Sequence, residues 1–310
     1  MSGPGQRTLY FLTGATAVGK TEWALRWAAD YDAEILSCDS LLFYRGMDIG
    51  TAKPTPAERA RVPHHLVDIL GIQEPMNIAR YAALAEAAVA DIAGRGRRVL
   101  VTGGSGFYLK SFFAPASDGV VVPDPVREEV RLLERTGGPG ALVRALDALN
   151  PSGLGSLDLS NPRRVSRALE RCLATGLPLR VLAEAFARIP PPFADWEKRL
   201  VRLERPREEL NLRIRVRSEA MVASGLVEEV RRILPDLASN PSAARAIGYR
   251  EVIDALHGRA PFEGLAERIA SNTRALVKKQ MTWFRTQVPE HRVVRAADLA
   301  SAADLFVPMA

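Results

Sequence analysis

The stretch GATAVGKT, Gly14–Thr21, decides the fold of this chain of 310 residues. It fits the pattern G-x-x-x-x-G-K-[ST], follows the apolar run Leu9–Thr13 and opens a helix expected over Thr21–Ala29. In that strand–loop–helix context the pattern predicts a phosphate-binding loop, or P-loop. Backbone N–H groups of the loop face phosphate oxygens, a lysine adds positive charge and a hydroxyl reaches Mg²⁺. These roles fall on Gly14, Ala15, Thr16, Ala17, Val18 and Gly19 for the backbone, on Lys20 for the charge and on Thr21 for the metal.

The segments around this loop predict an α/β fold, a P-loop core whose parallel sheet is flanked by helices. Apolar runs predict strands at Glu34–Ser37, Arg97–Thr102 and Leu200–Leu203, and helices are expected over Tyr81–Ile92, Arg207–Leu234 and Leu265–Val288. Between them, Asp124–Arg188 is helical in character, with turn residues at Gly137–Gly140 and a break at Pro190–Pro192. We therefore expect a core built from residues 1–118 and 199–310, with a helical insertion over 119–198.

Composition limits the function classes. The net charge of +6 and the pI of about 9.6 permit an acidic partner such as nucleic acid, although net charge specifies a partner weakly. Two cysteines far apart, Cys38 and Cys172, exclude a disulfide framework and a cysteine-rich zinc site. No apolar run of membrane-spanning length and no signal peptide are visible, so we expect a cytoplasmic protein without membrane contact.

Two further segments border the loop in the expected fold. Asp39 follows the second strand at the carboxyl edge of the sheet, where open α/β sheets bind ligands. It could bind magnesium through water or act as a general base, and it equally suits a helix N-cap. Thr102–Tyr108, TGGSGFY, allows close backbone approach to a ligand, while an ordinary strand-to-helix turn explains it as well.

Three basic segments interleave Lys or Arg with apolar or aromatic residues: NPRRVSRALE (Asn161–Glu170), RAIGYRE (Arg245–Glu251) and KKQMTWFR (Lys278–Arg285). Such side chains hold phosphates and stack on bases, and each segment could also be a solvated helix face. The P-loop alone favours ATP or GTP hydrolysis or a small-molecule kinase. Against that, no strand ends in a convincing Walker B aspartate and no N-K-x-D segment is present.

Taken together, these segments resemble the tRNA dimethylallyltransferases, also called tRNA isopentenyltransferases, of the bacterial type. The motifs that carry the resemblance are GATAVGKT, DSLLFYRGMDIGTAKP, VPHHLVDI, GGSGFY, NPRRVSRALE, AIGYRE and KKQMTWFR, in the family's order. It implies transfer of a dimethylallyl group from dimethylallyl diphosphate to N6 of adenine 37, in the anticodon stem-loop of tRNAs that read codons beginning with U. The product is N6-(dimethylallyl)adenosine, the second product is diphosphate, and the enzyme is expected to be an ATP-binding, Mg²⁺-dependent monomer.

The resemblance also assigns residues. Asp39 is implied as the general base, with Lys20, Thr21 and Arg217 as further catalytic residues; the P-loop and Arg213 hold the diphosphate, and Thr21 holds Mg²⁺. The implied tRNA-binding residues are Asp39, Ser40, Leu41, Leu42, Ser105, Arg127, Arg163, Arg164, Val165, Ser166, Arg167, Arg245, Ala246, Ile247, Gly248, Tyr249, Arg250, Lys278, Lys279, Gln280, Met281, Thr282, Trp283, Phe284 and Arg285. This chain departs from the family at Leu42, where Gln is frequent, at Ser105, where Thr is usual, and over 150–161. We also expect Phe107 and Tyr108 to line a pocket for the five-carbon tail.

Two other functions remain open on the residues alone. One is a P-loop kinase or nucleotide-triphosphate hydrolase that acts on a small molecule. The other is a non-catalytic RNA-binding protein whose P-loop only stabilises the fold. The missing Walker B argues against the first, and Asp39 beside the loop argues against the second.

Overall fold

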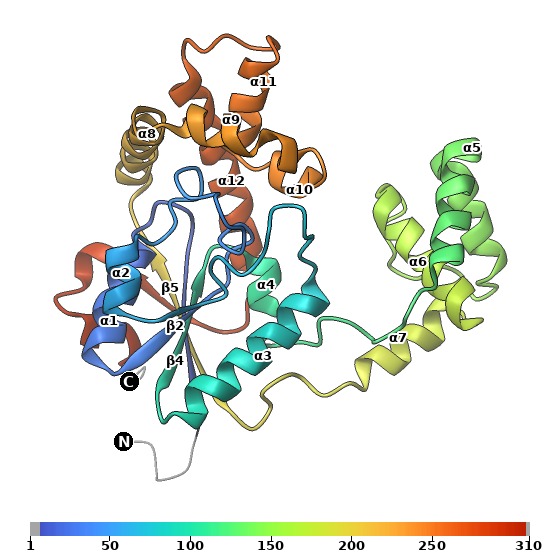
Figure 1. Ribbon diagram of the computed structural model, residues 1–310. Helices are drawn as coiled ribbons and strands as arrows, with labels where there is room; N and C mark the ends of the chain where they lie inside the picture. Colours follow the sequence, from blue (N-terminus) through green and yellow to red (C-terminus); the bar gives the residue numbers. More distant parts are fainter. Residues whose placement is uncertain (1–6, 308–310) are drawn as a thin grey trace. The chain divides into compact units, whose positions relative to one another are not determined.

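The structure, a computed structural model, describes residues 7–307 and divides them into two units (Figure 1). The larger unit comprises residues 7–113 and 195–307, and the smaller comprises Ala114–Ala194. The expected insertion over 119–198 is therefore corrected by a few residues at each end. Glu197 and Lys198 belong to a strand of the larger unit, because they pair with Thr8 and Leu9.

The larger unit contains a six-stranded sheet in which every neighbouring pair is parallel. Its spatial order is β3-β2-β4-β1-β5-β6. The strands are β1 (Thr8–Thr13), β2 (Ala33–Ser37), β3 (His64–His65), β4 (Arg98–Gly103), β5 (Glu197–Glu204) and β6 (Arg292–Arg295). This confirms the α/β fold. The four strands expected from the sequence correspond to β1, β2, β4 and β5. The sequence did not predict β3 or β6.

Helices cover both faces of this sheet (Figure 1). α1 (Lys20–Asp30) packs on one face, where Trp27 lies in a core with Leu12, Ile35 and Leu100. α2 (Pro56–Arg61) follows on the same side, while α3 (Ile78–Gly94) and α4 (Gly106–Lys110) cover the other face. Alternate residues of the buried strands thus supply two separate cores, as a sheet covered on both faces requires.

A helical layer stands beyond the carboxyl ends of the strands (Figure 1). It comprises α8 (Arg207–Ala223), α9 (Leu226–Leu237), α10 (Pro241–Ala244), α11 (Tyr249–Leu256) and α12 (Leu265–Gln287), and two 3₁₀ turns, Ala296–Asp298 and Ala302–Phe306, follow β6. The single helical stretch expected over Arg207–Leu234 is divided, because Gly225 adopts a φ of 95° and serves as the N-cap of α9.

The smaller unit is all helical: α5 (Asp124–Ala148), α6 (Pro162–Thr175) and α7 (Leu179–Ala187). It has its own core, which includes Val130, Leu142, Val165 and Leu182. The turn expected at Gly137–Gly140 is a kink inside α5, where Gly138 leaves helical geometry with φ 66° and ψ −175°. In the part of the chain that the structure describes, no helix combines the length and apolar character needed to cross a bilayer.

Candidate active site

The glycine-rich loop Gly14–Thr21 lies at the carboxyl end of β1 and leads directly into α1. Three of its residues have positive φ: Gly14 (146°), Ala17 (63°) and Gly19 (101°). A Cβ on Gly14 would stand 2.5 Å from the carbonyl oxygen of Leu203, so only glycine fits there. The chain thus turns tightly and directs backbone N–H groups toward one concave side, where an anion can be bound at the N-terminus of α1.

Lys20 reaches back across this loop. Its Nζ donates to the carbonyl oxygens of Gly14, at 2.9 Å, and Ala15, at 2.8 Å. An ammonium has three N–H donors, so the bonds seen among the described residues leave one for a ligand. Burial lowers the pKa of Lys20 to about 8, although the charge of Asp39 acts in the opposite direction. The lysine is therefore mostly charged at neutral pH, and a bound anion would raise its pKa and stabilise that charge.

Asp39 stands just beyond β2, and its Oδ1 accepts a hydrogen bond from the backbone N–H of Leu41 at 3.1 Å. This is a turn within a loop, and no helix begins here, so the alternative of a helix N-cap is wrong. The carboxylate raises the pKa of Lys20 and opposes the fall in pKa that burial causes at Arg217. Asp39 is thus held close to two cations in the same site.

Arginines from α8 and from the turn before it donate hydrogen bonds to the outer side of the glycine-rich loop. Arg205 donates through Nε to the carbonyl oxygen of Val18 at 2.7 Å, and Arg213 donates through Nε to that of Ala17 at 2.9 Å. One helical turn beyond Arg213, Arg217 points to the Thr16 hydroxyl at 3.4 Å and to the carbonyl oxygen of Thr51 at 3.5 Å. Burial lowers the pKa of Arg217, but a guanidinium keeps its charge at neutral pH. The sequence did not single out Arg205.

α12 closes the opposite side of the loop with two side chains one turn apart. Gln280 accepts the backbone N–H of Thr16 at 3.0 Å and donates to the carbonyl oxygen of Gly104 at 2.9 Å. Trp283 lies against Gly106, where an added Cβ would come within 2.1 Å of the indole ring. Gly106 of the TGGSGFY segment is therefore required for α12 to pack this closely.

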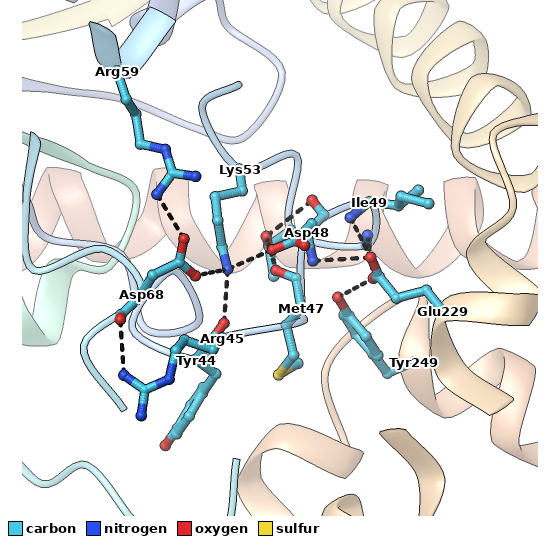
Figure 2. A network of polar contacts seen from close by, with 12 residues as sticks. Tyr44, Arg45, Met47, Asp48, Ile49, Lys53, Arg59, Asp68, Glu229 and Tyr249 are labelled. Atoms are coloured by element: carbon cyan, nitrogen blue, oxygen red, sulfur yellow. Dashed lines mark hydrogen bonds and ion pairs between the residues drawn. The ribbon is translucent and has the colours of Figure 1, made fainter. Parts of the chain in front are cut away.

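A polar network fixes the loop Met47–Lys53, which borders the site (Figure 2). The buried Glu229 of α9 accepts the backbone N–H groups of Asp48 (3.0 Å), Ile49 (2.8 Å) and Gly50 (3.2 Å). It also accepts the hydroxyl of Tyr249 at 2.7 Å. A Cβ on Gly50 would come within 2.4 Å of the Tyr249 ring. One carboxylate thus satisfies three backbone donors of a tight turn.

On the other side of this loop, Lys53 makes the matching contacts (Figure 2). Its buried Nζ donates to the carbonyl oxygen of Tyr44 at 2.7 Å and forms ion pairs with Asp48 at 2.7 Å and Asp68 at 2.5 Å. Arg59 forms a further ion pair with Asp68 at 2.6 Å. Residue-by-residue reasoning missed Glu229 and Lys53. The sequence offered one signal for each residue. Glu229 is a glutamate on an otherwise apolar helix face, and Lys53 is a lysine within MDIGTAKP.

Two cavities meet at this site. The first, which we call the Trp283 cavity, has a volume of about 550 Å³ and lies between the TGGSGFY turn, α8 and α12. The second, the Arg213 cavity, has a volume of about 930 Å³ and lies between the start of α1 and α8. Five residues line both cavities: Thr16, Lys20, Asp39, Thr51 and Arg217. The loop is therefore approached from two sides, with the charged groups at the junction.

Comparison with known proteins identifies the family. A family model described as IPP transferase matches residues 42–287. A tRNA dimethylallyltransferase of Opitutus terrae is 64% identical over 299 residues, covering 96% of each chain. One from Chloroflexus aurantiacus is 42% identical, covering 89% of this chain and 92% of the relative. The solved structure of the full-length tRNA isopentenylpyrophosphate transferase from Bacillus halodurans is 31% identical, with a TM-score of 0.67, covering 94% of this chain and 90% of that one.

This chain belongs to the IPP transferase family. The match spans both units, from the loop after β2 to the end of α12. The resemblance that the motifs carried is thereby confirmed.

Several residues implied to bind tRNA in this IPP transferase line the Trp283 cavity or lie exposed near it. They are Ser40, Leu41, Ser105, Arg245, Ala246, Ile247, Lys279, Gln280 and Trp283. Leu42 lines the Arg213 cavity. Arg250, Lys278, Thr282 and Arg285 are exposed, and Met281 is half-buried against the core beneath α1. Phe107 is 61% exposed and lines the Trp283 cavity.

Four of the residues expected to contact a ligand are buried in this structure. Tyr249 is fully buried with its hydroxyl on Glu229, and Phe284 is fully buried beside Trp283. Tyr108 packs in an aromatic core with Phe43 and Tyr81 rather than in a tail pocket. Gly248 lies buried at a φ of 95°, as the N-cap of α11. Of these four, Phe284 still lines the Trp283 cavity.

In the smaller unit, some of the implied tRNA-binding residues are exposed and others are buried. Arg163, Arg164 and Arg167 are exposed along α6, where Arg164 pairs with Asp158 at 3.2 Å and Arg167 with Glu170 at 3.0 Å. Arg127 is half-buried on α5 and donates to the carbonyl oxygen of Val122 at 3.2 Å. Val165 is 2% exposed within the core of this unit, which leaves its side chain little surface for a contact with tRNA. The Ser166 hydroxyl is buried as well.

Proposed function

We propose that this chain transfers the dimethylallyl group of dimethylallyl diphosphate to N6 of adenine 37, in tRNAs that read codons beginning with U. The coarser activity, dimethylallyl transfer to tRNA, is that of the family to which the chain belongs. The products are N6-(dimethylallyl)adenosine in tRNA and free diphosphate. We also propose that the enzyme acts as a monomer in the cytoplasm.

The observation that carries this proposal is the meeting of two cavities at Lys20, Asp39 and Arg217. A transfer between two substrates needs both to reach one point from separate directions. The Arg213 cavity, with the loop and two arginines, suits the diphosphate. The Trp283 cavity, with exposed Arg245 and Lys279 and the indole ring, suits a base and its flanking phosphates.

The chemistry follows from the charges at the junction. An allylic diphosphate ionises readily, so the barrier depends on stabilising the negative charge that collects on the departing diphosphate. Loop N–H groups, Lys20 and Arg217 hold fixed positive charge there, and such preorganised groups stabilise developing charge strongly. Asp39 accepts the N6 proton as the C–N bond forms, which contributes about 10²–10⁴-fold as general-base catalysis.

Magnesium fits this site through oxygen atoms. The Thr21 hydroxyl at the start of α1 and the Asp39 carboxylate line the same Arg213 cavity. Among the described residues, no group of three or more His, Cys, Asp or Glu side chains could enclose a metal. Mg²⁺ characteristically takes one or two protein oxygens and fills its shell with phosphate and water. When bound, it would neutralise diphosphate charge.

The acceptor adenine must leave its stack in the anticodon loop to reach Asp39, at a cost of a few kcal/mol. Stacking on an aromatic ring recovers about 1–3 kcal/mol per base. Trp283, held against Gly106, and the exposed Phe107 are placed for this at the wall of the cavity. Cationic side chains beside them would hold the phosphates that flank the flipped base.

The test is an incubation of the protein with tRNA and Mg²⁺, with either radiolabelled dimethylallyl diphosphate or γ-labelled ATP. We expect label in tRNA only from the allylic donor, on the adenine next to the anticodon, as located by nuclease digestion and mass spectrometry. ATP hydrolysis without label transfer would instead support a nucleotide hydrolase. Neither reaction, with tRNA still bound, would support a non-catalytic RNA-binding protein.

The matched variant is Asp39→Asn, which keeps the shape and the turn to Leu41 but removes the base. We expect its turnover to fall by about a hundredfold or more, with tRNA affinity close to that of the wild-type protein. Turnover near that of the wild type would refute the role given to Asp39.

A further inference from the structure

The side chain of Gln280 occupies a position on the glycine-rich loop that a phosphate would otherwise take. Its Oε1 accepts the backbone N–H of Thr16 at 3.0 Å. In loops of this pattern the backbone N–H groups are the phosphate donors. Here the donor at the Thr16 end is already paired with a neutral amide from α12, which lies 264 residues away in sequence.

The hydrogen bond between Gln280 and Thr16 is supported by the packing of α12 around it. The Nε2 of the same amide donates to the carbonyl oxygen of Gly104 at 2.9 Å, so both ends of the side chain are held. A Cβ on Gly104 would stand 2.8 Å from that Nε2. One turn further along α12, Trp283 fixes the helix against Gly106. Gln280 is therefore seated by two hydrogen bonds and by a glycine that leaves room for it.

The position of Thr16 gives this contact a consequence for ligand choice. Ala17, Gly19 and Thr21 line only the Arg213 cavity, Thr16 lines both cavities, and Gln280 lines only the Trp283 cavity. A chain of phosphates laid along the loop from the Arg213 cavity would bring its last phosphate toward Thr16. There it would meet the Gln280 carbonyl oxygen, which is an acceptor and repels phosphate oxygens.

We propose that Gln280 is a specificity-determining residue that limits the loop to a diphosphate and excludes a third phosphate. This inference rests on the proposed function, in which the space beyond the diphosphate holds an uncharged five-carbon group. An amide that satisfies the Thr16 N–H removes the donor that a triphosphate would use. It thereby lets a motif shared with nucleotide-triphosphate enzymes accept an allylic diphosphate.

The test compares the binding of two inorganic probes, pyrophosphate and tripolyphosphate, by calorimetry with Mg²⁺ and without tRNA. We expect the wild-type protein to bind pyrophosphate more tightly. In Gln280→Ala the Thr16 N–H is free, so the Kd ratio shifts about tenfold or more toward tripolyphosphate, the size expected for a hydrogen bond to a charged group. In Gln280→Glu the acceptor stays and gains charge, so the ratio shifts toward pyrophosphate.

The two variants are expected to shift the Kd ratio in opposite directions. This distinguishes a role in specificity from a purely structural role. If Gln280 only supported the packing of α12, both variants would weaken both probes and leave the ratio unchanged, and that result would overturn the proposal. So would tighter binding of tripolyphosphate by the wild-type protein. If Gln280→Ala does not fold, as judged by circular dichroism, the ratio measured for Gln280→Glu decides.

The control is Ser271→Ala, an exposed position on the same helix, for which we expect wild-type binding of both probes. Because the probes require neither tRNA nor a prenyl group, this experiment is independent of the transfer assay. A failed transfer with the predicted probe ratio would refute the proposed activity and leave the chain-length preference standing. A successful transfer with unchanged ratios would refute the role of Gln280 alone.

Discussion

At the scale of single residues, the site depends on which side chains the backbone turns outward. The charged groups that the motifs single out, Lys20, Asp39 and Arg217, do meet at one junction. The basic and aromatic segments were less informative. RAIGYRE and KKQMTWFR contain Tyr249 and Phe284, which are fully buried. Interleaving of charge and aromaticity shows that a helix is amphipathic, but only packing decides whether a given ring faces a ligand or the core.

Lys20 makes the reaction sensitive to pH. With a pKa lowered to about 8, its ammonium is mostly charged at neutral pH, half charged near pH 8 and neutral at higher pH. If the diphosphate binds the charged form, as proposed, its affinity is highest on the acid side of this pKa and falls on the alkaline side. We expect kcat/KM for the allylic donor to decline above about pH 8, approaching about tenfold per pH unit as for one ionisation.

The matched variant for this prediction is Lys20→Arg. A guanidinium stays charged across this range, so we expect the decline to disappear, with lower activity throughout because the geometry changes. A decline that persists in Lys20→Arg would place the titrating group elsewhere.

At the scale of elements, the apolar runs before and after the loop predicted β1, β2, β4 and β5 because buried parallel strands are continuously apolar. β3 and β6 escaped notice for a physical reason. β3 is two histidines long, and β6 contains Arg292 and Arg295 on an edge of the sheet. β3 has no apolar side chain and β6 has only Val293 and Val294, so neither forms an apolar run long enough to predict a strand without its neighbour.

The loop Met47–Lys53 is the element whose position depends most on one side chain. Glu229→Gln replaces a carboxylate that accepts four hydrogen bonds with an amide that has one acceptor oxygen and presents N–H groups to donors. We expect the free energy of unfolding to fall by about 1–3 kcal/mol, the cost of buried unpaired polar groups. Because Thr51 contacts Arg217, turnover should fall as well.

Urea unfolding followed by circular dichroism measures this loss. Glu228→Gln is the control, since Glu228 lies next to it on α9, is exposed and pairs only loosely with Arg231 at 3.8 Å. Equal stability of the two variants would show that Glu229 does not hold the loop.

At the scale of the whole molecule, the sequence indicated a helical insertion in an α/β core, and its helices were expected from their turn residues and Pro190–Pro192. Its ends were misplaced by a few residues. The reason is that Glu197 and Lys198 are polar residues at the start of β5, paired with β1. A strand that begins with charged residues resembles a linker in the sequence, because its pairing with another strand is visible only in the structure.

The smaller unit offers a test of tRNA binding that leaves the catalytic junction untouched. The triple change of Arg163, Arg164 and Arg167 to alanine removes three exposed charges from α6. We expect tRNA affinity to fall and the slope of log K against log salt to flatten by about 2, since each lost phosphate contact removes about 0.7–0.9.

Filter binding at several salt concentrations measures this slope. Arg180→Ala is the control, an exposed arginine of α7 in the same unit that pairs with Glu184. A slope equal to that of the wild-type protein in the triple variant would place the phosphate contacts outside α6.

The seating of α12 on the TGGSGFY turn has a consequence for how this protein can be changed. Trp283 requires a bare Gly106, and Gln280 as seated lies against a bare Gly104, although 176 residues separate Gln280 from Gly104. If α12 were replaced by the corresponding helix of a relative, the TGGSGFY turn would therefore have to be replaced with it. We therefore expect substitutions at Gly106 and at Trp283 to be coupled, because a side chain added at the first leaves no room for the indole of the second.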